Sequence, residues 1–313
     1  MAMTKAVLGQ VSDVDIRLLR VFRAVVDCGG FSAAELELNI GRSTISRHIK
    51  DLEDRLGGLI LCSRGRGGFA LSDEGREVYD ATLRLLSALD SFRTGINDLH
   101  QQLTGTLTLV FFDKIATNPD STIHTALGQF SEEAPEVELS MHVEGVNNIE
   151  SGVLEGKYDI GIIPMHRPST TLAYHHMFDE HMYLYCGRRH PLFSQPQCDR
   201  DDDRILACNY AGLGYHSPNM EVSQALQLRR RATAYDQEAI AILIRSGHYI
   251  AFLPDHYARF FVEQEQMRRI ENPRFYYLVQ YSAIVRRSPK PSRQVQTFLR
   301  CLEAAQQKPA EGG

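Results

Sequence analysis

The stretch from Leu18 to Gly75 constrains the fold more than any other part of this chain. Just before it, Ser12 and Asp15 have the Ser-x-x-acid spacing of a capping box, and Ser32 with Glu35 repeats that spacing. A Gly-Gly pair between the two boxes indicates a helix end, because glycine accepts the left-handed backbone conformation. Two short helices are therefore predicted, the first with a core face made of Ile16, Leu19, Val21, Phe22, Val25 and Val26.

A third helix is predicted from Arg42 to Leu56, after a turn at Asn39-Ile40-Gly41. Its apolar residues recur at spacings of four, three and four, so one face points inward: Ile45, Ile49, Leu52 and Leu56. A hairpin rich in glycine and arginine follows. This order is typical of a winged helix-turn-helix, which places one helix in a DNA major groove. We predict DNA contacts from polar and cationic residues on the outer face, the preceding helix and the hairpin: Ser32, Arg42, Ser43, Thr44, Ser46, Arg47, Lys50, Arg64 and Arg66.

The distribution of charge along the chain supports DNA binding, whereas the net charge of the chain does not. The chain has 34 basic and 39 acidic residues, and its net charge of −5 alone would argue against nucleic acid. The five cations of the third helix and hairpin nevertheless form a local set, with no acid between residues 42 and 50 or 62 and 72. Binding needs a local patch rather than a basic protein. The alternative is a solvated helix face that happens to be basic; the capping boxes, turn and hairpin favour DNA binding.

Residues 14–75 resemble the N-terminal domain of LysR-type transcriptional regulators. The residues that carry the resemblance are Leu19, Phe22, Val25, Gly30-Phe31-Ser32, Ala33-Ala34, Leu38, Ile45-Ser46, Ile49, Leu52-Glu53, Leu56-Gly57, Arg64 and Leu71-Ser72-x-x-Gly75. The chain departs from the family pattern where Gly41-Arg42 replaces the usual Ser-Gln, and where Leu61 replaces an aromatic residue. Arginine at that place favours guanine N7 and O6, or a phosphate, over adenine. The resemblance implies promoter binding controlled by a small-molecule effector.

The next segment, from Glu74 to Leu103, contains no proline and predicts one long helix. Its apolar residues are Val78, Leu85, Leu89, Phe92, Ile96, Leu99 and Leu103, and the last six alternate by four and three, as in a coiled-coil seam. We interpret it as a dimerisation helix, which the resemblance also favours. The alternative is that it packs on its own C-terminal domain. A two-fold dimer would present two helices and two wings to pseudo-palindromic half-sites.

After Gly105 the pattern changes to alternating strands and helices. Strands are predicted at 106–111, 137–143, 158–163, 204–208, 227–232 and 248–253, with helices at 122–130, 149–154, 219–226 and 238–246. The βαβ order implies parallel strands with helices on both faces. The resemblance implies a periplasmic-binding-protein-like effector domain of two subdomains, with landmarks at Ala134-Pro135-Glu136-Val137, Tyr158-Asp159-Ile160-Gly161, His190-Pro191-Leu192 and Leu253-Pro254.

The predicted organisation is therefore an α+β winged helix-turn-helix, a long dimerisation helix and an α/β effector domain. The expected boundaries are 12–73 for the DNA-binding domain, 74–104 for the linker helix, 105–305 for the effector-binding domain and 306–313 for a disordered tail. Within the effector domain, subdomain I takes about 105–178 and 286–305, and subdomain II about 179–285.

Small molecules in open α/β folds bind beyond the carboxyl ends of the strands, often against helix N-termini. That rule selects loops with these candidate effector-binding residues: Phe112, Asp113, Lys114, Thr117, Asn118, Pro164, Met165, His166, Asn209, Tyr210, Tyr235, Asp236 and Phe252. Lys114 and a helix N-terminus could hold a carboxylate, while Phe112, Tyr210 and Phe252 could flank an apolar body. We therefore expect a small organic or aromatic acid as the effector.

Cysteine and histidine patterns favour no further chemistry. Six cysteines have no C-x-x-C spacing and no preceding secretion signal, as in reduced cytosolic thiols. A redox switch between Cys198 and Cys208 is an alternative. His166, His175, His176 and His181 fit no zinc spacing, so neither a metal nor another cofactor is expected. No apolar run reaches membrane-spanning length, and a cytoplasmic location is expected.

The favoured interpretation is a non-enzymatic transcription regulator. Its expected partners are double-stranded promoter DNA, a small-molecule effector and further copies of itself in a homodimer or homotetramer, with RNA polymerase as another candidate. The alternatives are an enzyme or a ligand-binding α/β protein in which the N-terminal domain is only accessory. The sequence contains no nucleophile elbow or phosphate loop, and Gly212-Leu213-Gly214 lacks the spacing of a dinucleotide fingerprint.

Overall fold

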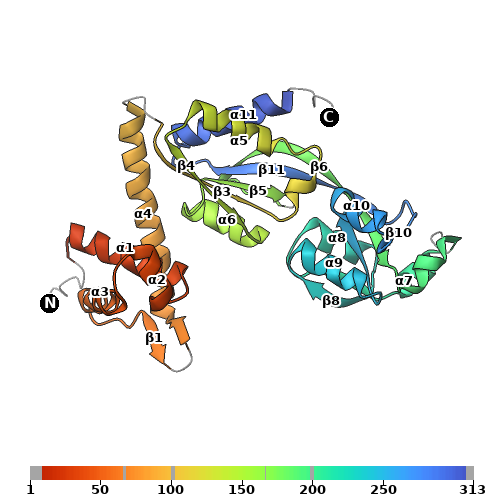
Figure 1. Ribbon diagram of the computed structural model, residues 1–313, viewed down its shortest axis with the longest axis horizontal. Helices are drawn as coiled ribbons and strands as arrows, with labels where there is room; N and C mark the ends of the chain where they lie inside the picture. The colour runs from red at the N-terminus through yellow and green to blue at the C-terminus, as the bar shows by residue number, and fades with distance from the viewer. Residues whose placement is uncertain (1–8, 66–67, 100–102, 166, 198–200, 308–313) are drawn as a thin grey trace. The chain divides into compact units, whose positions relative to one another are not determined.

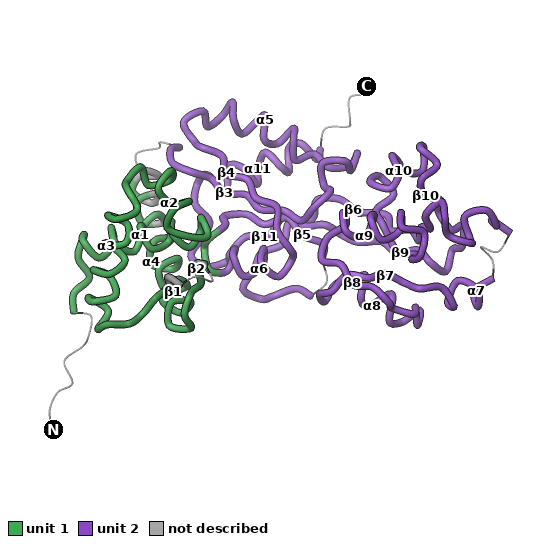
Figure 2. The backbone as a smooth tube through the Cα atoms, turned by 60° about the horizontal axis from the view of Figure 1, so that its bottom comes forward, with its two compact units in different colours: residues 1–96, 155–157 green, residues 97–154, 158–313 purple. Residues whose placement is uncertain are grey.

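The computed structural model describes residues 9–65, 68–99, 103–165, 167–197 and 201–307. The chain forms two compact units, coloured separately in Figure 2. Unit 1 contains residues 1–96 with 155–157, and unit 2 contains residues 97–154 and 158–313. The expected disorder of the tail falls mostly on residues 308–313, which lie outside the described ranges.

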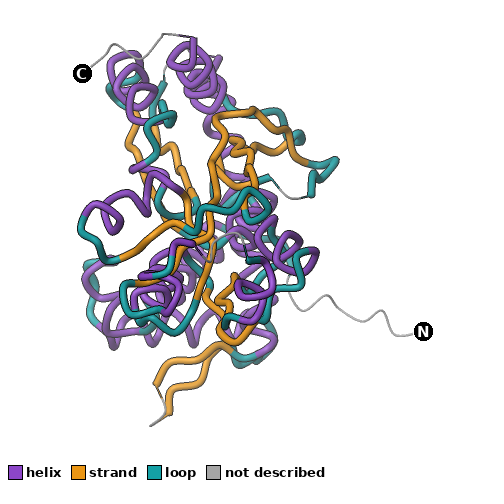
Figure 3. Tube along the Cα trace, turned by 90° about the vertical axis from the view of Figure 1, so that its right-hand side faces the viewer, coloured by secondary structure: helices purple, strands orange, loops and turns teal. Residues whose placement is uncertain are grey.

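Unit 1 is the predicted three-helix domain with a hairpin and a long helix (Figure 1). Its elements are α1 (Asp13–Asp27), α2 (Phe31–Leu38), α3 (Arg42–Arg55), β1 (Cys62–Gly65), β2 (Gly68–Leu71) and α4 (Asp73–Leu99). The core gathers buried apolar residues from the first three helices and the start of the hairpin, among them Leu18, Phe22, Ala34, Ile45, Ile49, Leu52 and Leu61. Figure 3 shows β1 and β2 as a narrow antiparallel hairpin.

The first predicted capping box is confirmed and the second is wrong. The Asp15 carboxylate accepts a hydrogen bond from the Ser12 backbone N–H at 2.8 Å, which fixes the start of α1. The second helix begins two residues earlier than that box predicts, with Gly30 instead of Ser32 as its N-cap, at φ 146°. Its Glu35 carboxylate instead accepts the backbone N–H of Arg42, the first residue of α3. The side chain predicted to cap α2 therefore ties α2 to α3.

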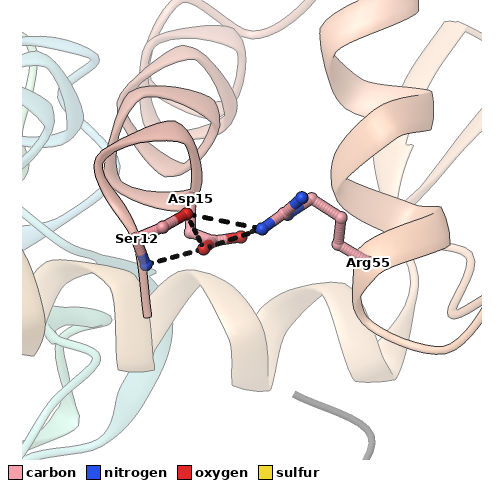
Figure 4. Close-up of polar contacts among 3 residues, drawn as sticks. All are labelled: Ser12, Asp15 and Arg55. Atoms are coloured by element: carbon pink, nitrogen blue, oxygen red, sulfur yellow. Dashed lines mark hydrogen bonds and ion pairs between the residues drawn. The ribbon is translucent and has the colours of Figure 1, made fainter. Parts of the chain in front are cut away.

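Asp15 also joins α1 to α3, as Figure 4 shows. Its side chain is 3% exposed and forms an ion pair with Arg55, the last residue of α3, while the Ser12 hydroxyl donates to the same carboxylate at 2.5 Å. The hydrogen bonds from Arg55 and Ser12 hold the pKa of Asp15 well below its usual range. This contact joins the first turn of α1 to the last residue of α3.

Gly75 permits a close approach between α4 and the chain that leads into β1. A β-carbon at this position would lie 1.9 Å from the Leu61 carbonyl oxygen, so no larger residue fits without moving the backbone. The same carbonyl accepts the Ser72 N–H at 3.1 Å. The Leu-Ser-x-x-Gly motif therefore joins the hairpin to the long helix through the backbone.

Unit 2 is built on one mixed sheet with strand order β4-β3-β5-β11-β6-β9-β7-β8, and β10 pairs with β6. The strands are β3 (Gly105–Phe111), β4 (Val137–Val143), β5 (Ile160–Pro164), β6 (Leu172–Gly187), β7 (Tyr210–Leu213), β8 (Arg230–Ala234), β9 (Ile250–Pro254), β10 (Met267–Arg269) and β11 (Tyr276–Arg286). β3 runs parallel to β4 and β5, and β7 runs parallel to β8 and β9. The antiparallel pair β6 and β11 joins these two parallel groups.

The helices of unit 2 are α5 (Ile123–Glu133), α6 (Val146–Glu155), α7 (Asp202–Ala207), α8 (Pro218–Ala225), α9 (Gln237–Arg245), α10 (Asp255–Glu263) and α11 (Arg293–Gln307), with short 3-10 turns η1 (Ile115–Thr117) and η2 (Pro191–Ser194). In Figure 1, α5 and α11 lie together on one side of β3 and β4, and α6 lies on the other. We call 105–171 with 287–307 the first half and 188–275 the second half.

Three predictions about elements need correction. Of the strand predicted at 204–208, residues 204–207 form part of helix α7 and Cys208 is its C-cap, because Asp201 caps the start of the helix by accepting the Arg204 N–H. The described part of the long helix runs to Leu99, and Leu103 is not helical but packs against the core of unit 2 instead of extending the predicted seam. The sequence pattern also predicted neither β6 nor β11. Among the described residues, no helix is long and apolar enough to cross a membrane.

Candidate functional site

The predicted DNA-binding residues of α3 share its outer face. Arg42, Ser43, Arg47 and Lys50 are exposed, and Thr44 and Ser46 are half-buried. Ile45, Ile49 and Leu52 are buried on the inner face, as their spacing predicted. Gly41 is the N-cap of α3, and its carbonyl accepts the N–H groups of Thr44 and Ile45. Gly41 has no side chain to cap the helix, and Arg42 is the first residue of α3.

The charges on this face are free to meet an external partner. Among the described residues, no carboxylate forms an ion pair with Arg42, Arg47 or Lys50, whereas Arg55 on the same helix is engaged by Asp15. Ser32 is exposed on α2. Arg64 lies in strand β1, and Arg66 lies outside the described residues. Hydroxyl and cationic groups on one helix face are suited to base edges and phosphates.

The long helix α4 has two kinds of apolar residue. Leu83 and Leu86 are buried. Phe92 and Ile96, both in the predicted seam, are 70% and 42% exposed. Large apolar side chains exposed in a row on one helix commonly mark a surface for another protein. The described part of the seam is therefore available for a partner helix.

Three of the predicted effector-binding residues, Asp113, Lys114 and Asp236, meet where β3 ends and α9 begins. The Asp113 carboxylate accepts the Gln237 backbone N–H at 2.9 Å. Asp236 caps α9 by accepting the Ala239 N–H at 2.7 Å. Lys114 forms an ion pair with Glu238 of the same helix. These contacts bring the carboxyl end of a strand in the first half against a helix N-terminus in the second half.

A second polar contact between the halves starts at Thr117. Its hydroxyl lies 2.8 Å from Nδ1 of His256, and Nε2 of His256 lies 2.8 Å from the Glu180 carboxylate. The Tyr281 hydroxyl also hydrogen bonds with Glu180. Both His256 and Glu180 have side chains only 3% exposed. Burial raises the pKa of Glu180, while the hydrogen bonds from His256 and Tyr281 oppose that shift.

Sequence reasoning missed Glu180, His256, Tyr215 and Gln237. One signal for Glu180 was present, because it shares period-two parity with Phe178, Met182 and Leu184 and therefore falls on the buried face of a strand. A buried carboxylate among such residues requires partners. No comparable local signal marks His256, which reaches Glu180 across seventy-six residues of chain.

Burial changes the chemistry of Asp113. It raises the pKa of this carboxyl to about 6, and the hydrogen bond from Gln237 and the charge of Lys114 counteract only part of that effect. Burial likewise raises the pKa of the neighbouring Tyr215, and the negative charges of Asp113, Asp236 and Glu180 add to the shift. Carboxylates therefore dominate the charge around Tyr215.

The other predicted effector residues are scattered. Phe112, Tyr210 and Phe252 are buried in the core, and Asn118 is buried where it accepts the Asp120 N–H. Tyr235 is exposed. Pro164 pairs with Tyr281 at the end of β5, and the Met165 N–H donates to the Gln280 carbonyl. His166 lies outside the described residues. Asn209 precedes β7, so it lies at the amino end of that strand. The mistaken strand at 204–208 is the reason, because it made Asn209 appear to follow a carboxyl end.

Other candidate sites carry less chemistry. A cavity of about 270 Å³ is lined by Glu150, Leu154, Arg167, Pro168, Ser169 and Leu172, and it contains none of the predicted effector residues. No group of His, Cys, Asp and Glu suited to a metal ion occurs in the part of the chain that the structure describes. Cys208 carries a free thiol, and its potential redox partner Cys198 falls outside the described residues.

Comparison with known proteins gives two family matches. Residues 16–76 match the bacterial regulatory helix-turn-helix protein, lysR family, and residues 100–307 match the LysR substrate binding domain. The chain is 42% identical to the HTH-type transcriptional activator BauR of Pseudomonas aeruginosa over 295 residues, covering 94% of this chain and 96% of that protein.

Two solved structures show the same fold. One is full-length CbnR complexed with its target DNA, with a TM-score of 0.62 and 20% identity, covering 93% of this chain and 99% of that one. The other is full-length AphB, a virulence activator of Vibrio cholerae, with a TM-score of 0.54 and 17% identity, covering 92% and 98%. The winged helix-turn-helix and the two-halved α/β domain are thus found together in proteins of similar length.

Proposed function

Because this chain belongs to the LysR family of transcriptional regulators, we propose that the outer face of α3 reads its promoter DNA. The protein is a DNA-binding transcription regulator under the control of an effector, and its relatives are regulators rather than enzymes. In this proposal Arg42 and Arg47 contact base edges, and Lys50 contacts a phosphate. Ser32, Ser43, Thr44 and Ser46 orient the helix on the backbone, and the hairpin with Arg64 and Arg66 adds phosphate contacts.

The observation that carries the proposal is the contrast between the two faces of α3. The inner face is closed by the core, and the outer face presents three cations that pair with no carboxylate among the described residues. Three cations that extend from one exposed face are available to phosphates and base edges. Arg42 in the first turn is placed to favour guanine, because arginine can donate two hydrogen bonds to N7 and O6.

We further propose that α4 joins two copies of the chain through Phe92, Ile96 and the rest of the seam. Pairing would cover the apolar residues that remain exposed in one copy. Two copies would place two α3 helices on half-sites of one operator. A tetramer made of two such dimers and a contact with RNA polymerase are further parts of this proposal, in which the protein works in the cytoplasm on promoter DNA.

The effector is proposed to bind between the halves of unit 2, beside Asp113, Lys114, Thr117 and Asp236. Polar contacts cross between the halves there, so a ligand in this position would change how the halves meet. A ligand controls the regulator only to the extent that it binds one arrangement more tightly than another. This region supports that role better than the cavity beside Arg167, which is formed by the first half and the start of β6.

The DNA proposal is tested by replacing Arg42 and Arg47 with alanine in the full-length chain. Duplexes selected by the wild-type protein from a random pool serve as operators, and fluorescence anisotropy measures binding to selected and unselected DNA. The variant should lose at least about tenfold in affinity for selected DNA, since one good base contact is worth ~1–3 kcal/mol. A matched variant with Arg231 and Arg259 replaced, both exposed on unit 2, should bind as the wild type does. Unchanged discrimination by the Arg42 and Arg47 variant would refute the assignment.

A further inference from the structure

Three buried oxygen atoms between the halves of unit 2 have no hydrogen-bond partner among the described residues. They are Oδ1 of Asp113, Oε1 of Gln237 and the hydroxyl of Tyr215. Buried polar atoms are normally paired, so each unpaired one requires an explanation. An unpaired carboxylate oxygen is the most costly of the three, because burial of a charge without a partner is strongly unfavourable.

These atoms belong to one region. The Gln237 N–H donates to the other oxygen of Asp113 at 2.9 Å, and the Gln237 residue is only 4% exposed. Tyr215 packs edge-on against Phe112, the residue before Asp113, with ring centroids 6.1 Å apart. The Asp113 and Glu180 carboxylates are both close enough to influence Tyr215 electrostatically. The unpaired atoms thus come from the loop after β3, the loop after β7 and the first turn of α9.

The chemistry of the three atoms calls for a donor. A carboxylate oxygen and an amide oxygen can only accept hydrogen bonds, and a tyrosine hydroxyl can do either. Positive groups nearby are already used, since Lys114 pairs with Glu238 and His256 contacts Glu180. Negative groups are in excess, because Asp113, Asp236 and Glu180 all contribute to the local field. An anionic ligand would be repelled at this position.

We propose that the effector carries a protonated primary amine, whose N–H groups are received by Asp113, Gln237 and Tyr215. An ammonium group has three donors and a positive charge, which matches three unpaired oxygens in a negative region. The ring of Tyr215, held edge-on against Phe112, provides an apolar surface for the carbon atoms next to the nitrogen. This inference rests on the proposed effector site and replaces the expectation of Lys114 as a carboxylate holder, because Lys114 is occupied by Glu238.

The proposal has a definite pH dependence. Burial raises the pKa of Asp113 to about 6, so below pH 6 most of this carboxyl is protonated. An ammonium group then has to displace that proton before it can bind the carboxylate. Affinity for an amine should therefore fall as pH decreases through 6, by up to about tenfold per pH unit below it. An anionic effector would show the opposite trend. The other titratable groups around Asp113 are Lys114, Glu180, Asp236, Tyr215, Tyr257 and Tyr281, with His256 behind Glu180.

The test uses the full-length protein and four probes of equal carbon number: n-butylamine, γ-aminobutyrate, n-butyrate and n-butanol. Melting temperature is measured with each probe at high concentration, since a ligand that binds only the native state raises it. Tetramethylammonium at the same ionic strength controls for positive charge without N–H donors. Probes with an ammonium group should raise the melting temperature at pH 7.5, and the shift should be smaller at pH 5, where the affinity is about tenfold lower. The shift should be abolished in Asp113→Asn, reduced in Tyr215→Phe, and unchanged in Asp120→Asn, which alters an exposed carboxylate.

Several results would overturn the inference. These are stabilisation by butyrate or butanol alone, an equal shift with tetramethylammonium, a shift retained in Asp113→Asn, or no shift with either amine. None of them bears on whether α3 binds DNA, because the Arg42 and Arg47 experiment is done without effector. A regulator that binds selected DNA but responds only to butyrate would keep its proposed function and lose its proposed effector class.

Discussion

Replacement of Gly75 by alanine should destabilise unit 1 even though alanine favours helices. At an exposed position inside a helix, this exchange ordinarily stabilises by ~1 kcal/mol. At Gly75 the new β-carbon would lie 1.9 Å from the Leu61 carbonyl oxygen. Carbon and oxygen atoms in contact are normally about 3.3 Å apart. The backbones of α4 and Leu61 must therefore separate by roughly 1.4 Å, given that normal distance.

Leu61 cannot move without further losses. Its carbonyl accepts the Ser72 N–H at 3.1 Å, its own N–H donates to Glu53 at 2.9 Å, and its side chain is buried in the core. Two weakened hydrogen bonds at ~1 kcal/mol each and ~1–3 kcal/mol of strained packing exceed the helix gain of ~1 kcal/mol. The net loss is about 2–4 kcal/mol, which corresponds to a decrease of roughly 10–20 °C in the melting temperature of a domain this small.

Gly128 in α5 provides the matched control, because a β-carbon there would meet no atom within 4 Å. Gly128→Ala should stabilise its unit by up to ~1 kcal/mol. Scanning calorimetry of the full-length variants would measure the transitions, and hydrogen exchange of peptides from each unit would assign them. If Gly75→Ala left unit 1 as stable as the wild type, or made it more stable, the close contact with Leu61 would not exist in solution.

Three further changes test other parts of the structure. Asp15→Asn should lower the melting temperature of unit 1 by several degrees at neutral pH, because Arg55 and Ser12 hold the carboxylate ionised. A depressed pKa stabilises above the unfolded value of about 4, so calorimetry should show the gap from wild type closing as pH falls below it, and a constant gap would contradict the contact. Five cations per chain make ten in a dimer, so the slope of log affinity against log salt concentration is at most about −9, at roughly −0.9 per phosphate contact. Lys50→Ala should make this slope shallower by about two, and an unchanged slope would remove Lys50 from the phosphate contacts. Phe92→Glu should shift the sedimentation of the full chain toward a monomer, whereas Leu36→Glu, also at an exposed apolar residue, should not; a retained dimer would exclude this part of the seam.

Local patterns predicted unit 1 well because its structure depends on local interactions. The spacing of Ile45, Ile49 and Leu52 identified the inner face of α3, and Ser12 with Asp15 marked the start of α1. The same reasoning was wrong at Ser32, because Glu35 has a competing partner in the Arg42 N–H. The sequence pattern alone cannot show which of two nearby donors a carboxylate accepts.

Unit 2 was predicted less completely because its central strands pair over long distances. β6 and β11 are neighbours although about a hundred residues separate Tyr183 from its partner Tyr276. The expectation that ligands bind beyond the carboxyl ends of strands selected Asp113, Lys114, Thr117 and Asp236, because each of them is next to a predicted strand or helix. It could not find Glu180 or His256, since only the β6 pairing and the docking of α10 bring them to Thr117.

The path of the chain through β6 and β11 also decides the order in which unit 2 can be completed during synthesis. The second half is continuous in sequence, from 188 to 275, so all its strands except the shared β6 and β11 are made in one run. The first half needs β11 and then α11, where Phe298 packs on Phe130 of α5 and Gln294 donates to the Thr104 carbonyl. The first half of unit 2 is thus begun first and completed last. A chain whose synthesis stops before residue 293 lacks α11, and the first half, rather than the second, then lacks a helix that packs on it.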